Sequence, residues 1–149
     1  PYESHSVVPL DLNYWFFHTM HHEFCHILTQ TKNYSTDFNV ISAGSYHASD
    51  WVNVTDKSAA KQGFVSGYAS GEYNEDFAET YATYVTNSEA GWNKIIAEAG
   101  EDGAAIINKK LDIVREYFKD SWGIDLDVMR SILMRRSKEV TSLDLRNLD

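Results

Sequence analysis

Three residues in one short stretch, His22, Glu23 and His26, have the types and the spacing that metal-assisted hydrolysis needs. Residues four apart lie on the same face of a helix, so the two imidazoles can reach one metal ion. The carboxylate of Glu23 follows His22 directly and can act as a general base toward a water molecule at the open position of the metal. Because the pattern His-Glu-x-x-His is typical of zinc hydrolases, these residues predict a catalytic Zn2+ site.

The residues around this motif predict a long helix with two faces. Residues 11–32 contain no Pro or Gly, and apolar side chains recur at helical spacing. One stripe is apolar and is predicted to be buried: Phe17, Met20, Phe24 and Ile27 or Leu28. The other stripe carries His18, His22, Cys25, His26 and Thr29. A catalytic zinc ion needs only three protein ligands, so His18 and His21 are expected to support the site or to face solvent. The alternative is a core helix that happens to carry surface histidines.

The composition of the 149-residue chain predicts a single globular domain. A net charge of -9 leaves no basic patch for phosphates, which argues against nucleic acid and anionic membrane surfaces as partners. The single cysteine, Cys25, excludes an internal disulfide and a cysteine-based zinc cluster, and its place in the helix indicates packing. No apolar run reaches membrane-spanning length.

The rest of the chain predicts a mainly α fold with little or no sheet. Outside the motif helix we expect an extended lead-in (1–10), a surface loop (33–56), a short helix (56–62), an extended glycine-punctuated segment (63–71) and a polar tail (141–149). Four further helices are predicted, one that begins near the capping residue Asn74 and three over residues 89–99, 103–122 and 125–140. The surface loop is expected either to form the wall of a cleft or simply to connect its neighbours. The last three helices show no catalytic constellation and are interpreted as support for the site.

Two histidines need a further protein ligand, and the residues present exclude two known solutions. A metzincin would continue with Gly at position 29 and His at position 32, where this chain has Thr29 and Lys32, and the inverted H-x-x-E-H order is absent. Residues 75–79, EDFAE, resemble the paired-acid element of gluzincins, in which the first acid binds zinc and the second hydrogen-bonds a ligating histidine. The resemblance implies that Glu75 is the third ligand and that Glu79 fixes the histidine tautomer. Without it, these acids would simply favour a helix N-terminus.

A closer resemblance spans most of residues 15–135. The shared segments are HEFCHIL at 22–28, GFVS at 63–66, EDFAE at 75–79 and a lysine-containing helix that ends before Trp122. They are similar to the substrate import-associated zinc metallohydrolase lipoproteins, zinc-binding metallopeptidases found beside glycan and nutrient uptake systems of gut bacteria. The resemblance implies a lipid-anchored protein of the cell envelope that faces the periplasm or the exterior, acts on a peptide or protein and associates with an outer-membrane uptake system. The lipid anchor would lie upstream of Pro1. The β-sheet that normally precedes the active-site helix of a zincin would also lie there, unless this domain has very little sheet.

The gluzincin resemblance implies one more catalytic residue. Lethal-factor-type gluzincins carry a tyrosine seven residues before the ligand glutamate, and Tyr68 stands seven residues before Glu75. A phenol at that place could donate a hydrogen bond to the oxygen on which negative charge develops. Tyr73 is a competing candidate, and packing is the ordinary role of a tyrosine in such a segment.

These observations predict a mainly α, gluzincin-like zinc metallopeptidase of one domain, residues 1–149, that hydrolyses peptide bonds through zinc-activated water with Glu23 as the general base. Two alternatives stay open. One is a zinc hydrolase of another amide bond, and the other is a binding module of a nutrient-uptake complex with a vestigial metal site. The intact Glu23 argues against the binding module.

Overall fold

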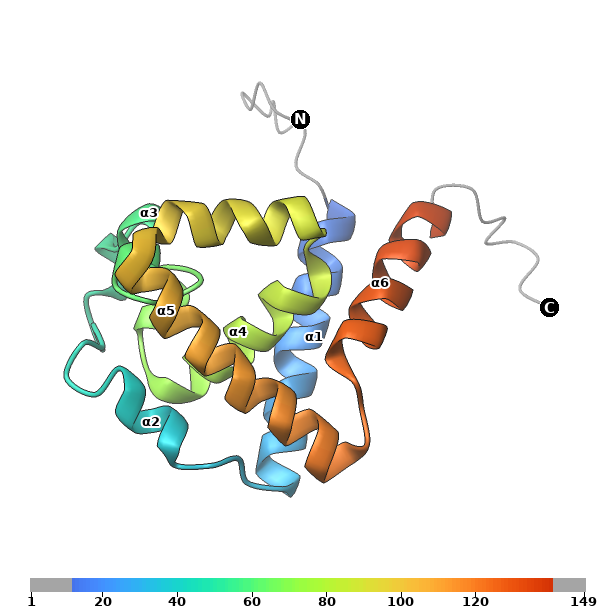
Figure 1. The fold of residues 1–149 in the computed structure, drawn as a ribbon, viewed down its shortest axis with the longest axis horizontal. Coiled ribbons are helices and arrows are strands. Elements are labelled where there is room, and N and C mark those ends of the chain that lie inside the picture. Colours follow the sequence, from blue (N-terminus) through green and yellow to red (C-terminus); the bar gives the residue numbers. More distant parts are fainter. Residues whose placement is uncertain (1–11, 141–149) are drawn as a thin grey trace, which may run out of the picture.

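The computed structural model describes residues 12–140, and every regular element among them is a helix (Figure 1). The α-helices are α1 (Leu12–Thr31), α2 (Asp37–Ile41), α3 (Asp56–Lys61), α4 (Tyr73–Thr86), α5 (Glu89–Trp122) and α6 (Leu126–Val140). Two single-turn 3-10 helices, η1 (Trp51–Asn53) and η2 (Tyr68–Ser70), lie in the connections. The prediction of a mainly α fold is thus confirmed. The predicted lead-in (1–10) and tail (141–149) lie outside the described residues.

The helix α4 is at the centre of the molecule and contacts α1, α5 and α6 (Figure 1). Its residues 76–86 are all buried. Its aromatic side chains join the core: the ring of Phe77 stacks on Tyr34 with centroids 4.0 Å apart, and the ring of Tyr81 stacks on Phe118 at 4.3 Å. A buried polar side chain needs a hydrogen-bond partner, so the acidic and hydroxyl side chains of α4 must find theirs on the surrounding elements.

The helix α1 turns its histidine stripe, and not its apolar stripe, toward α4. His22 is 5% exposed and Leu28 is 8% exposed, whereas Met20, Phe24 and Ile27 are 46–60% exposed. The predicted burial of these three apolar residues is therefore wrong. The reason is that α4 presents carboxylates, and the rotation of α1 that satisfies them leaves the apolar stripe uncovered within the part of the chain that the structure describes.

The second half of the chain folds as the glycines predicted. A break at Gly100, with a φ of 70°, divides α5 into two parts that run in different directions (Figure 1). These two parts correspond to the predicted helices over 89–99 and 103–122. Gly123, with a φ of 67°, ends α5, and α6 follows close to its predicted limits. Glycine readily adopts a left-handed backbone of this kind, which explains why the helix breaks at Gly100 and ends at Gly123.

The connections contain more structure than the sequence predicted. The predicted loop over 33–56 includes α2, held by the fully buried Phe38, and η1. The segment over 63–71 is not extended throughout, because it includes η2. Thr55 caps α3 by accepting a hydrogen bond from the backbone N–H of Ser58. The predicted cap Asn74 lies inside α4, which begins at Tyr73 after Glu72.

Candidate metal centre

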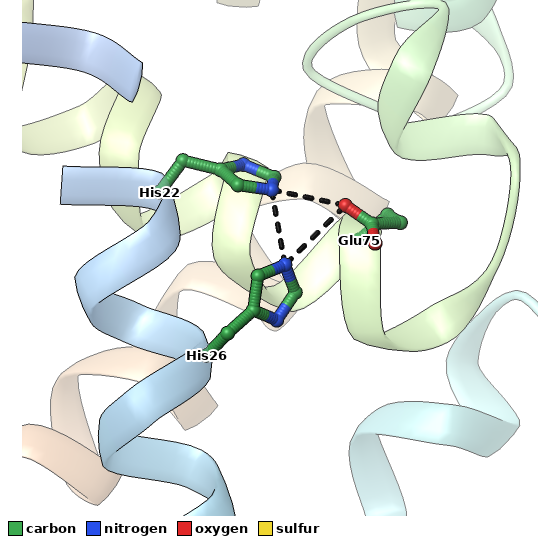
Figure 2. A group of neighbouring side chains, drawn as sticks. All are labelled: His22, His26 and Glu75. Carbon is green, nitrogen blue, oxygen red and sulfur yellow. Dashed lines mark hydrogen bonds and ion pairs between the residues drawn. The ribbon is translucent and has the colours of Figure 1, made fainter. Parts of the chain in front are cut away.

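Three side chains from two helices converge on one point (Figure 2). His22 and His26 project from successive turns of α1, and Glu75 projects from the first turn of α4. His22 Nε2 lies 3.0 Å from His26 Nε2 and 2.9 Å from Glu75 Oε2, and His26 Nε2 lies 3.4 Å from that oxygen. A tetrahedral zinc ion with bonds of about 2.0–2.1 Å would hold its ligand atoms about 3.3 Å apart. The size of the triangle therefore fits one metal ion.

The contacts of His22 decide which of its ring nitrogens faces the other two ligand atoms. Oε1 of Glu79 lies 2.8 Å from His22 Nδ1, and since an ionised carboxylate only accepts, the proton of that bond belongs to His22. In a neutral His22 ring, Nε2 then carries a lone pair that points at the carboxylate of Glu75 and at His26 Nε2. Either a metal ion or a second proton on His22 holds such a set together. Burial lowers the pKa of His22, but Glu79 and Glu75 outweigh burial and raise it above its ordinary value.

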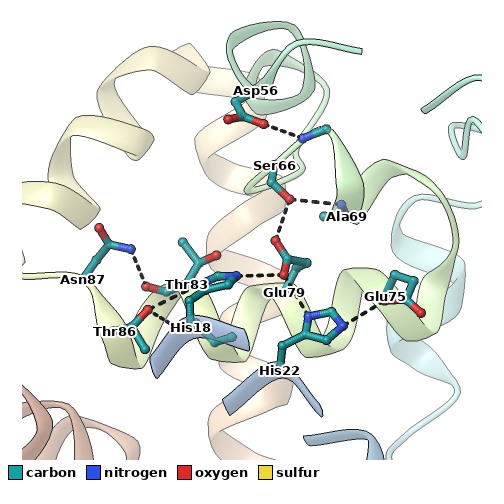
Figure 3. A network of polar contacts seen from close by, with 12 residues as sticks. His18, His22, Asp56, Ser66, Ala69, Glu75, Glu79, Thr83, Thr86 and Asn87 are labelled. Atoms are coloured by element: carbon teal, nitrogen blue, oxygen red, sulfur yellow. Dashed lines mark hydrogen bonds and ion pairs between the residues drawn. The ribbon is translucent and has the colours of Figure 1, made fainter. Parts of the chain in front are cut away.

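Glu79 connects the triangle to the rest of the molecule (Figure 3). Its Oε1 accepts hydrogen bonds from His22 and from His18 Nε2 at 2.9 Å, and its Oε2 accepts one from Ser66 Oγ at 2.7 Å. Burial alone would raise the pKa of Glu79, but the bonds from His18 and His22 lower it to about 2. The ionised carboxylate thus orients the His22 ring so that Nε2 points into the triangle. Ser66 was not singled out as a site residue in the sequence, although it lies in the GFVS segment.

Glu23 and the two candidate tyrosines lie around the triangle. Glu23 is exposed and lines both of the clefts that flank the site. The ring of Tyr68 lies 5.7 Å from the ring of His22, centroid to centroid. Partial burial and the nearby carboxylates, Glu75 foremost, raise the pKa of Tyr68 to about 12. Tyr73 is 43% exposed and lines the cleft on the other side, so both tyrosines border the site.

The two clefts meet at Glu23 and differ in their ligand residues. The first, of about 440 Å³, is lined by His22 and Tyr68, and we call it the His22 cleft. The second, of about 650 Å³, is lined by His26 and Glu75, and we call it the His26 cleft. Both volumes are in the range of about 300–1,000 Å³ that is usual for ligand sites. The residues of the metal triangle therefore line two clefts that share Glu23.

The predicted loop over 33–56 contributes to the wall of the His22 cleft. Trp51 and Val52 of η1 line this cleft, followed by Val54 and Asp56. Of the two interpretations that the sequence left open, the structure supports the cleft wall rather than a plain connection.

A second polar cluster, which the sequence did not reveal, lies on another side of α4. Lys110 Nζ is 2.7 Å from Asp76 Oδ2, and these side chains are 1% and 0% exposed. Lys110 also donates a hydrogen bond to the backbone oxygen of Gly63 at 2.7 Å, and the Tyr46 hydroxyl donates one to Asp76 at 2.9 Å. In the sequence, the one indication of this cluster is the position of Lys110, which has the helical spacing of the buried residues Ile107, Leu111 and Val114 of α5.

The remaining candidates of the motif helix lie away from the triangle. Cys25 is fully buried, and burial raises the pKa of its thiol, as suits a packing residue. His21 Nδ1 pairs with the hydroxyl of Tyr81 at 3.2 Å, and burial followed by the charge of His18 lowers its pKa. Among the described helices, none is long and apolar enough to cross a membrane.

Comparison with known proteins identifies one class. Residues 3–127 match the model of a family described as "Putative zinc-binding metallo-peptidase". A solved structure from Bacteroides caccae, described in the same words, is similar with a TM-score of 0.88 and 44% sequence identity. The similarity covers 92% of this chain and 52% of that one, so this chain spans about half the length of its relative. None of the curated proteins matches. The chain belongs to this family of zinc-binding metallo-peptidases.

Proposed function

We propose that this chain hydrolyses peptide bonds with a zinc ion held by His22, His26 and Glu75. The observation that carries the proposal is the triangle of His22 Nε2, His26 Nε2 and Glu75 Oε2, whose sides are 2.9–3.4 Å. Imidazole nitrogen and carboxylate oxygen are ligand atoms that zinc prefers, and these distances are close to the spacing of about 3.3 Å that a tetrahedral ion would give. When bound, zinc polarises a carbonyl group and lowers the pKa of a water molecule toward about 7.

Glu23 acts as the base and then as the acid. Its carboxylate is exposed where the two clefts meet, so it faces both the incoming water and the bound peptide. There it accepts a proton from the attacking water and returns it to the departing amine.

Tyr68 donates a hydrogen bond to the carbonyl oxygen as negative charge develops on it. The ring of Tyr68 lies beside that of His22, on the wall of the His22 cleft. A donor must carry its proton at the working pH, and the pKa of about 12 keeps the phenol protonated. Glu79 holds His22 in the tautomer that can ligate.

The decisive test is the substitution Glu23→Gln. Glutamine has the same shape but accepts no proton, so we expect the variant to keep its zinc and to lose about 10²- to 10⁴-fold in kcat. Metal analysis of the purified protein and mass spectrometry of a peptide library before and after incubation measure the two properties. Glu101→Gln, at an exposed position of α5, is the matched control. Wild-type turnover by zinc-loaded Glu23→Gln would overturn the mechanism.

The role of Tyr68 is tested against Tyr73. Tyr68→Phe should leave the zinc content unchanged and lower kcat by about 10²-fold, with little change in KM, because the hydrogen bond forms mainly in the transition state. Tyr73→Phe should have no such effect. The reverse result would move the role to Tyr73, and two unaffected variants would leave neither tyrosine with a catalytic role.

A further inference from the structure

We infer that the His22 cleft binds a large apolar side chain, so that the protein prefers peptide bonds next to such a residue. The inference rests on the proposed peptidase function and names its substrate class. The observation that carries it is the wall of the cleft, which is formed by Trp15 of α1, Trp51 and Val52 of η1, Val54 and Tyr68.

This wall leaves apolar surface open beside a polar centre. Val52 is 66% exposed, Trp15 is 51% exposed and Tyr68 is 40% exposed. Apolar groups that face a cleft favour a ligand that removes them from water. Tryptophan and tyrosine are the side chains that most often anchor such contacts. The fitting occupant is an aromatic or long aliphatic side chain.

Contacts within the chain hold this wall in place. Trp51 packs against Tyr68 edge to face, with centroids 4.8 Å apart and an angle of 82° between the rings. A Cβ atom on Gly71 would lie only 3.3 Å from Cδ1 of Trp51. The absence of a side chain at Gly71 therefore lets the indole pack close to the backbone. The backbone N–H of His47 donates to the carbonyl of Ser70 at 2.7 Å and ties this loop to η2. A wall that is fixed by such contacts lowers the entropy cost of binding.

The His26 cleft has a more polar lining than the His22 cleft, so the two sides of the metal triangle should accept different side chains of a bound peptide. Its lining is mainly polar and includes Asn33, Thr36, Asn39, Glu72 and Asn74. A peptide that crosses the metal triangle would therefore place its large apolar side chain on the His22 side of the scissile bond and a small or polar one on the other side.

Charge narrows the substrate class further. Carboxylates line both clefts, among them Glu23, Asp56 and Glu72, and neither lining includes a Lys or Arg among the residues that the structure describes. Like charges repel across such a groove, so acidic peptides are disfavoured and neutral or basic peptides are accepted.

Binding without cleavage provides the cleanest test. We propose to load Glu23→Gln with zinc and to titrate it by calorimetry with peptides that are identical except for Phe, Leu, Ala or Glu at one position. The Phe and Leu peptides should bind at least about tenfold more tightly than the Ala peptide, and the Glu peptide should bind most weakly. Adding Trp51→Ala or, as the milder change, Val52→Ser should reduce the preference for Phe over Ala. Asn39→Ala in the His26 cleft is the control that should keep it.

Cleavage by the otherwise unchanged protein separates this inference from the proposed function. Cleavage of the series without preference for Phe or Leu would uphold the peptidase and overturn the inference. A preference that survives both Trp51→Ala and Val52→Ser would also overturn it. Binding selective for Phe, lost in these two variants, would uphold the inference even if the zinc-loaded protein cleaved none of the peptides, a result that would overturn the proposed function instead.

Discussion

Two polar clusters lie on different sides of the helix α4, and their key residues, Glu75 and Asp76, are neighbours in the sequence. Asp76 faces α5, where Lys110 Nζ lies 2.7 Å from its Oδ2, and the Tyr46 hydroxyl donates a hydrogen bond to the same oxygen. Glu75 faces α1, where its Oε2 meets the Nε2 atoms of two histidines. The first cluster is closed to solvent and contains its own cation. The second opens to two clefts, and among the residues that the structure describes no Lys or Arg lines them.

This difference shows how one helix can serve stability and chemistry together. A cluster whose charges are matched internally fixes the position of a helix, and breaking one partner is costly. A cluster of imidazoles and carboxylates that is open to a cleft can bind a metal ion from outside. Successive residues of a helix lie about 100° apart around its axis. The ion pair between Asp76 and Lys110 fixes the rotation of α4 and so also sets the direction in which Glu75 points.

The largest effect is expected from breaking the closed cluster. Lys110→Met leaves the buried carboxylate of Asp76 without its cation, and we expect the free energy of unfolding to fall by about 3–5 kcal/mol. Urea denaturation of the zinc-free protein measures it. The double variant with Asp76→Asn should recover much of the loss, whereas Lys109→Met, at an exposed neighbouring position, should change little. A loss no larger than that of Lys109→Met would mean that the cluster does not hold α4.

Breaking the open cluster should affect zinc affinity more than folding. Glu79→Gln removes the carboxylate that orients His22, and changes of this kind weaken metal binding about 10- to 100-fold. Glu75→Gln removes a ligand and should weaken it further. Competition with a zinc-binding dye measures both. If Glu79→Gln abolished binding and Glu75→Gln did not, the two glutamates would have to exchange roles.

The smallest effect is expected from a change of pH, which alters the protonation of His22 in the open cluster. The pKa of His22 is raised above its ordinary value of 6.5 in the metal-free protein, so its protonation contributes stability that is present below 6.5 and is lost as pH rises through the raised pKa. Zinc needs the neutral ring, so its affinity should fall as pH falls through that value, by about tenfold per pH unit for one displaced proton. Glu79→Gln removes a cause of the raised pKa and should move the fall to lower pH. An unmoved midpoint would show that Glu79 does not control His22.

The sequence predicted those parts of the site that depend on local spacing. His22, Glu23 and His26 lie within one helix, so their relation follows from helical geometry alone. Which distant segment supplies Glu75 depends on the packing of α4 against α1, and only the family resemblance pointed to it. Lys110 was missed because a single lysine on an apolar face resembles one that extends to solvent.

The predicted fold succeeded where glycines and periodicity agree and failed where tertiary contacts decide. Gly100 and Gly123 marked real breaks. The five-residue α2 is too short for a periodic signal. The motif helix offered two stripes that could each be buried, and only the carboxylates of α4 decide between them.

Because α1 buries its histidine stripe, apolar side chains stay on its surface and should affect self-association and dye binding of the purified protein. Phe16, Met20, Phe24 and Ile27 form an apolar strip along the outer side of α1, and each is 46–62% exposed. At low ionic strength, the net charge of -9 keeps molecules apart, but salt screens this repulsion and sulfate strengthens apolar association. Self-association should therefore increase with ammonium sulfate. The strip should also bind hydrophobic dyes in the native state, so circular dichroism is a safer measure of unfolding than dye fluorescence.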